Sequence, residues 1–309
     1  MKKKILMYLF FIFFVFNINS NSLENKILVK IENQIITSVD IYNEYKYLVA
    51  LNPNIKNSKK EDIIKLSKKS IIQEKIKKIE IEKNFNDPKL PQQFLKQILQ
   101  SVYSRIGFNN LDDFKKYLIS NNIDFENVKN KLKIEALWNE LILIKFSSKV
   151  KINETKLRNK INKNSNKYLK SYLMSEIFFE VSNLKELDNK FLEIKNVIND
   201  KGFDFAALKY SVSSTSNFGG KLDWINESSL NKNVKKLIKD LEINDFTKPI
   251  IVPGGFLILQ INDIKNTKVD VDLEKELKKL VYYEKNNQLN QYSKIYFNKI
   301  KKDLEINEL

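Results

Sequence analysis

The chain has 309 residues, contains neither cysteine nor histidine, and carries a formal net charge of +16. This composition excludes disulfides, thiolate nucleophiles, Cys/His zinc sites and imidazole acid–base chemistry. The six glycines and five prolines are too few for a turn-rich sandwich or barrel, so a largely helical protein is favoured.

The positive charge comes almost entirely from lysine, because Arg105 and Arg158 are the only arginines. The lysines are spread along the chain, and planar recognition of phosphates or bases favours arginine. We therefore expect solvated lysine-rich faces and no nucleic-acid partner. A surface that attracts acidic clients is the alternative.

The first 22 residues are expected to be a signal peptide. Three lysines at 2–4 precede an apolar run at 5–16, and the small Ser20 and Ser22 stand before the expected cleavage point. The run is shorter than the roughly 20 residues that a spanning helix needs. The sequence thus predicts export to the periplasm without stable membrane insertion after cleavage. A retained membrane anchor is the alternative.

Residues 26–37 alternate between apolar and polar positions and predict a strand pair with its turn at 32–34. Thr37 or Ser38 can then cap a helix.

Residues 60–150 have helical periodicity, with breaks at Pro88 and Pro91. Asp124 can cap a long helix over 125–146.

The rest of the chain alternates between strand and helix patterns. Residues 151–170 are rich in lysine and asparagine, with a weak helical signal, and suggest a connector. We expect a strand at 172–181, helices at 184–198 and 204–210, a hairpin at 250–264, and a long amphipathic helix from 271 to about 306.

Residues 172–264 contain three motifs in a fixed order. They are Gly202-Phe-Asp-Phe-Ala-Ala-Leu208 followed by Tyr210-Ser211, the loop Gly219-Gly-Lys-Leu-Asp-Trp224, and a closing segment with Pro249 and Gly255–Ile261. Together they resemble the parvulin family of prolyl isomerases. Asp223 and Asn233 depart from the family pattern, where Gly and Pro are common. The order and spacing of the motifs imply a parvulin fold for this segment.

The flanking segments resemble the SurA-type periplasmic chaperones, with a short strand pair and helices before the parvulin segment and one long helix after it. The resemblance implies an α+β protein, in which a mostly α-helical chaperone body carries one inserted parvulin-like β-α-β domain. The expected division is 1–22 signal peptide, 23–165 N-terminal helical chaperone domain, 170–266 parvulin-like domain, and 271–309 C-terminal helix packed on the N-terminal domain.

A prolyl isomerase lowers a barrier of roughly 18–20 kcal/mol with an apolar slot for the proline ring and polar groups that favour the twisted amide. The resemblance places Leu222, Leu230 and Val234 in the substrate-binding slot, and ordinary core positions are the equal alternative. It places Glu176 and Leu257 where parvulins usually carry histidines.

The resemblance also places Ser213 at the family's central Asp or Cys position. Because the chain has no histidine, we expect weak or absent isomerase activity with peptide binding retained.

The sequence therefore predicts a periplasmic chaperone or foldase that binds unfolded or extended polypeptides, outer-membrane proteins in particular. No cofactor or metal is expected. An active peptidyl-prolyl cis-trans isomerase that assists exported proteins is the alternative. A foldase tethered to the inner membrane is a third, minor possibility.

Overall fold

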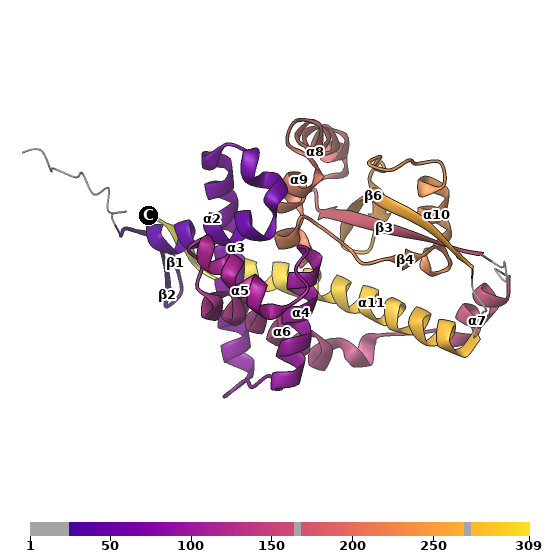
Figure 1. The fold of residues 1–309 in the computed structure, drawn as a ribbon, viewed down its shortest axis with the longest axis horizontal. Helices are drawn as coiled ribbons and strands as arrows, with labels where there is room; N and C mark the ends of the chain where they lie inside the picture. The colour runs from indigo at the N-terminus through magenta and orange to yellow at the C-terminus, as the bar shows by residue number, and fades with distance from the viewer. Residues whose placement is uncertain (1–24, 164–167, 269–272) are drawn as a thin grey trace, which may run out of the picture.

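The computed structural model describes residues 25–163, 168–268 and 273–309 (Figure 1). The predicted signal peptide, residues 1–22, lies outside them. The helices are α2 (Ser38–Leu51), α3 (Lys60–Asn84), α4 (Gln92–Arg105), α5 (Leu111–Ser120), α6 (Phe125–Phe146), α7 (Glu154–Lys163), α8 (Leu187–Lys201), α9 (Phe203–Tyr210), α10 (Lys232–Ile238) and α11 (Leu273–Asp303). The strands are β1 (Ile27–Ile31), β2 (Gln34–Thr37), β3 (Tyr168–Phe179), β4 (Ile225–Asn226), β5 (Ile250–Val252), β6 (Gly255–Lys268) and β7 (Ile306–Glu308).

The two ends of the described chain meet in a small antiparallel sheet with the order β2-β1-β7. The strand pair and the helix after it are as expected, and Thr37 is the cap, since its side chain and that of Asp40 form a reciprocal capping box. The C-terminal helix differs from expectation. It ends at Asp303, and Ile306 lies in β7, because the last residues pair with the open edge of β1.

Helices α2 to α6 form the part of the molecule that we call the helical body. Asp124 caps α6 through its side chain, as the sequence predicted. Asn110 caps α5 in the same way, and Gly107 has a positive φ of 95° after α4. Helix α7, expected as a connector with weak helical signal, is a regular helix whose Leu157 and Ile161 pack against α11.

Residues 168–268, the parvulin-like region, are built on a four-stranded antiparallel sheet with the order β4-β3-β6-β5. Helices α8 and α9 cover one face of this sheet, where Ile177, Phe179 and Ile258 are buried. The short helix α10 covers part of the opposite face, where Met174 and Leu259 are buried. Side chains alternate between the faces of a strand, so consecutive residues belong to different cores.

Helix α11 connects all parts of the molecule (Figure 1). Its first turns pack Leu277 and Leu280 against α7, and its middle brings Tyr283 to the apolar cluster on the α10 side of the sheet. Its last turns bury Phe297 and Ile300 against α3, α6 and the strand pair. Each section of α11 buries its own apolar side chains against a different part of the molecule, so the helix fixes the positions of these parts relative to one another.

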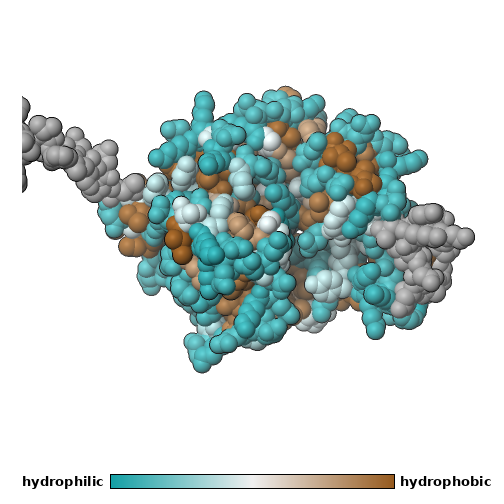
Figure 2. Space-filling view, viewed as in Figure 1, coloured by the Kyte–Doolittle hydropathy of each residue, from teal (hydrophilic) through white to brown (hydrophobic). Residues whose placement is uncertain are grey.

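The parvulin-like region is docked on the helical body. Phe205 and Leu208 of α9 are buried in the core formed by α2 to α6. The Asn52 side-chain amide donates to the carbonyl oxygen of Asn217 at 2.7 Å, and that of Asn54 donates to Asp204 at 2.7 Å. Figure 2 shows a mostly hydrophilic face with apolar residues in small separate groups.

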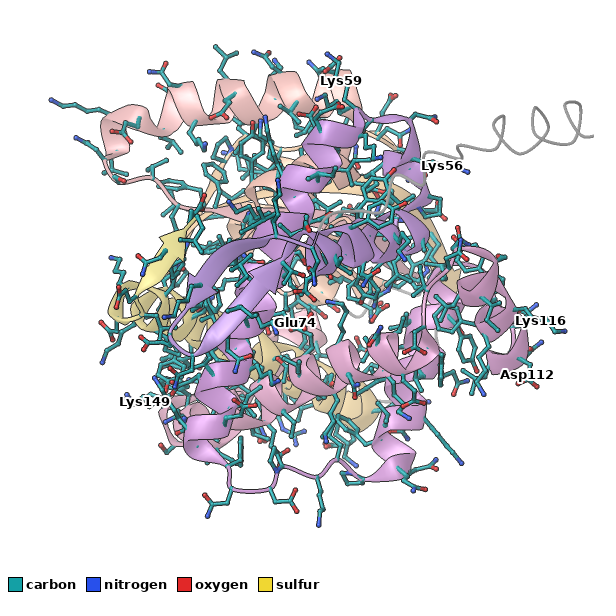
Figure 3. All side chains as sticks on the ribbon, turned by 90° about the vertical axis from the view of Figure 1, so that its left-hand side faces the viewer. Lys56, Lys59, Glu74, Asp112, Lys116 and Lys149 are labelled. Carbon is teal, nitrogen blue, oxygen red and sulfur yellow. The ribbon has the colours of Figure 1, made fainter. Side chains whose placement is uncertain are left out.

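An ionic cluster ties three helices of the body together. The Lys131 ammonium lies 2.5 Å from the buried Glu44 carboxylate and also pairs with Glu74, which Figure 3 places near the middle of the view. Burial alone would lower the pKa of Lys131, but the two carboxylates outweigh it and raise that pKa above its usual value. The charges satisfy one another, which marks the cluster as structural.

Candidate functional site

The double glycine at 219–220 sets the geometry of the candidate site. The Glu176 amide of β3 donates to the carbonyl oxygen of Gly220 at 2.8 Å, which brings the loop onto the strand. A Cβ at Gly220 would lie 2.2 Å from the Glu176 carbonyl oxygen, and one at Gly219 would lie 2.8 Å from the side chain of Asp204. Both glycines also have positive φ, so only glycine permits this approach.

Ser211 attaches the start of the same loop to β3. Its hydroxyl accepts from the Phe178 amide at 3.1 Å and from the Ser213 amide at 3.2 Å. The Val212 amide donates to the Phe178 carbonyl oxygen at 2.9 Å. These bonds place the hydroxyl of Ser213 beside the β3 residue Glu176.

Glu176, Ser213 and Thr215 form one polar cluster. The hydroxyls of Ser213 and Thr215 both donate to Oε1 of Glu176, the latter at 3.0 Å. Thr215 is absent from the sequence prediction. The only sequence feature that points to Thr215 is weak: it is a second hydroxyl residue in the same loop, two positions after Ser213.

Four predicted residues, Leu222, Leu230, Val234 and Leu257, belong to one apolar cluster on the α10 side of the sheet. Leu230 and Val234 are buried, while Leu222 and Leu257 are half-buried.

Glu176 shares this face with Leu257. Glu176 pairs with Leu259 and Phe178 pairs with Leu257, and paired residues point to the same face. The structure therefore brings the predicted slot residues and the predicted polar residues to one face. Their roles in binding or catalysis stay predictions.

Helix α11 lies over this face. Tyr283 packs in the apolar cluster, and the Lys294 ammonium lies 3.7 Å from the ring centroid of Phe178. Burial raises the pKa of the Tyr283 hydroxyl, and the nearby Glu176 carboxylate adds to the rise. Burial lowers the pKa of Lys294, against the opposing effect of Glu176 and Glu180. The sequence prediction missed both covering residues.

The space around Ser213 is small. It is a cavity of about 30 Å³ between the 212–217 loop, the body helices α3 and α6, and α11, with Glu74, Trp138 and Lys294 in its wall. One ordered water needs roughly 10–15 Å³ measured in this way, so the cavity has room for about two waters and none for a peptide. In this arrangement the polar cluster is closed on its body side.

The polar cluster has no spare hydroxyl donor. A hydroxyl has one proton to donate, and those of Ser213 and Thr215 are both directed at Glu176, so neither is left for a twisted amide. Leu257 offers no polar group. In the part of the chain that the structure describes, no group of three or more acidic side chains is arranged to hold a metal ion.

Comparison with known proteins shows what this chain is similar to. Residues 177–263 match the family model described as the PPIC-type PPIase domain of rotamases. The chain is 21% identical over 178 residues to the chaperone SurA of Pseudomonas putida, which covers 55% of this chain and 42% of that protein. It is 25% identical over 310 aligned positions to SurA of Buchnera aphidicola, which covers 86% of this chain and 71% of that protein.

A solved structure described as one of two SurA-like chaperones of Campylobacter jejuni is 16% identical and covers 92% of this chain and 99% of its own, with a TM-score of 0.33. The chain spans less than half the length of its Pseudomonas relatives. Among the described residues, none of the helices combines the length and apolar character needed to cross a bilayer. Residues 177–263 therefore form a parvulin-type domain of the PpiC class, within a chain that is similar to SurA chaperones over most of its length.

Proposed function

We propose that this protein is an exported, periplasmic chaperone that binds unfolded polypeptides, outer-membrane proteins in particular, and that its PpiC-type domain is weak or inactive as an isomerase. In this proposal residues 23–165 and 271–309 form the chaperone body, and residues 170–266 form a domain held against it. The relatives named SurA chaperones support the role in folding.

The observation that carries the proposal is that the hydroxyl donors beside Glu176 are already used, with Ser213 buried. The polar cluster lies under α11 and beside a cavity of about 30 Å³, with both hydroxyl protons already bonded. Only groups that stabilise the twisted amide more than the planar one accelerate isomerisation. A polar cluster whose hydroxyl protons are both bonded to Glu176 does not provide such groups.

Aggregation of an unfolded outer-membrane barrel protein tests the chaperone role. We expect the purified protein to suppress light scattering at stoichiometric amounts, because a holdase without ATP acts by binding. An unfolded water-soluble protein of similar size is the control for outer-membrane preference. Unchanged scattering at several-fold molar excess would contradict the proposal.

A protease-coupled assay on a proline peptide separates this proposal from the alternative, an active isomerase. We expect rates near background for the wild type and for Tyr283→Ala, which removes the covering ring. Tyr282→Ala is the matched control, since its neighbouring side chain is 69% exposed. A rate above background that Tyr283→Ala raises and Leu222→Asp abolishes would establish the active isomerase instead.

The mass of the exported protein tests the compartment and the processing. We expect a periplasmic form that begins at Leu23, as cleavage after Ser22 predicts. A full-length form in the inner-membrane fraction would favour the tethered foldase.

A further inference from the structure

A groove of about 850 Å³ is lined by residues of α7, of α10 and of α11, together with those just before α7 and α10. Figure 1 shows α7, α10 and the start of α11 toward the same end of the molecule. Leu157 of α7 and Leu230, just before α10, contribute its apolar lining, and Glu284 contributes from α11. Its volume is within the range of about 300–1,000 Å³ that is usual for ligand sites. The groove is therefore large enough for several residues of an extended chain.

The groove is strongly basic. Four of its lining residues are lysines, Lys151, Lys156, Lys232 and Lys235, and Glu284 is its single carboxylate. Within the described part of the chain, no ion pair is formed by any of the four, whereas Lys77, Lys131 and Lys201 elsewhere are paired with carboxylates. The single carboxylate of Glu284 leaves most of the positive charge in this groove without a counter-charge from its lining.

The groove adjoins the candidate site of the PpiC-type domain. Leu230 lines the groove and also belongs to the apolar cluster with Leu222 and Leu257. On the other side, Glu284 follows Tyr283, which packs in that cluster. An extended chain in the groove can thus place an apolar residue against Leu157 and Leu230 while its neighbours reach the lysines.

We propose that this groove binds acidic segments of extended polypeptides, with an apolar residue against Leu157 and Leu230 and carboxylates facing the four lysines. The inference rests on the proposed chaperone function and names a class of client segment for it. A polypeptide fits better than single-stranded nucleic acid, because the described lining holds no aromatic ring for base stacking and no arginine.

Binding of a fluorescent peptide of about ten extended residues, long enough to cross such a groove, tests the proposal on the full-length protein. The peptide carries a central Leu-Pro flanked by Asp and Glu, and a matched peptide carries Asn and Gln instead. We expect tighter binding of the acidic peptide, and a preference that declines as salt is added, since screening weakens exposed charge pairs.

Charge removal within α10 provides the matched variants. The double variant Lys232→Gln/Lys235→Gln should weaken binding of the acidic peptide by about 3- to 10-fold, the effect of losing two exposed charge pairs. Lys236→Gln/Lys239→Gln makes the same charge change on exposed residues at the same helix that do not line the groove, and it should leave binding unchanged.

Equal losses in the two double variants, or equal affinity for the acidic and the amide peptides, would overturn the proposal. So would displacement of the peptide by a single-stranded oligonucleotide whose own binding depends on Lys232 and Lys235. The chaperone function is tested separately: suppression of aggregation without any acidic preference refutes the groove alone, whereas failure to suppress aggregation refutes the function beneath it.

Discussion

The two faces of the sheet in the PpiC-type domain are covered in different ways. Helices α8 and α9, which follow β3 directly in the chain, cover one face and bury Ile177 and Ile258 completely. The other face carries Glu176 and is covered by the seven-residue α10 and by α11, which arrives from the far end of the chain. One face is covered by helices of the domain itself. The other face is fully covered only when α11 packs onto it.

This difference links access to the candidate site with the packing of the whole protein. The last turns of α11 bury Phe297 and Ile300 in the core of the helical body, while Tyr283 lies on the site face. Exposing that face requires movement of α11 or of the domain against the body. The face covered by α8 and α9 has no such dependence.

The largest expected effect comes from breaking the self-contained face. Ile258→Ala removes a side chain with no exposed surface and should lower the free energy of unfolding by about 3–4 kcal/mol, as buried Ile→Ala changes do. Leu257→Ala is the matched variant, since it truncates the next residue, which is half-buried on the site face, and should cost about 1–2 kcal/mol.

Urea unfolding followed by circular dichroism measures both variants. The ratio of the two losses in unfolding free energy tests whether packing on the two faces of the sheet contributes differently to stability. Equal losses would mean that α11 packs the site face as firmly as α8 and α9 pack the other.

Much of this arrangement was predictable from the sequence, because its signals are local. Capping residues such as Asn110 and Asp124 bond within their own helix turn, and the double glycine marks a loop that no other residue can form. Alternation along β3 and β6 brings Glu176 and Leu257 to one face. The overall α+β organisation, with a helical body and one PpiC-type domain, is confirmed.

The features that the sequence did not predict depend on contacts between segments that are far apart in the chain. Strand β7 has three residues, too few for a periodic pattern, and forms because the edge of β1 is open to it. Tyr283 has the sequence context of any amphipathic helix, and only the path of α11 places it against Leu222 and Leu257. Thr215 has a role only because the loop folds back onto Glu176.

A smaller effect is expected from the loop that positions the polar cluster. Gly220→Ala adds a Cβ that would meet the Glu176 carbonyl oxygen at 2.2 Å, in a backbone conformation with φ of 74°, and should cost about 3 kcal/mol. Gly202→Ala is the matched control, with φ of 86° and no atom within 4 Å of the added carbon, so it should show strain alone, about 1–2 kcal/mol.

Comparing the unfolding free energies of the two glycine variants tests whether close contact between the loop and β3 contributes to stability. Faster amide exchange at Glu176 and Leu222 in the Gly220→Ala protein is expected as well, because both amides are bonded in this region. Equal costs for the two variants would show that the loop can move away from β3 freely.

The smallest effect concerns Lys69, which joins the helical body to the loop that carries Ser213. Its ammonium group donates to the Lys209 carbonyl oxygen at 2.9 Å and approaches that of Ser211 at 3.4 Å. Burial lowers the pKa of Lys69 to about 8, and the charges of Lys301 and Lys190 contribute to the decrease. An unfolded lysine has a pKa of about 10.4.

Between these two pKa values the unfolded chain binds the proton that the folded protein has lost, so stability rises with pH. Between pH 7 and pH 10, Lys69 should thus add about 2 kcal/mol to the free energy of unfolding. The measurement is urea unfolding across this range for the wild type, Lys69→Met and the control Lys65→Met, which changes an exposed lysine of the same helix. We expect Lys69→Met alone to remove the rise. A constant difference between wild type and Lys69→Met at all pH values would mean that Lys69 stays protonated in the interface, and that the contact between the body and the site loop does not respond to pH.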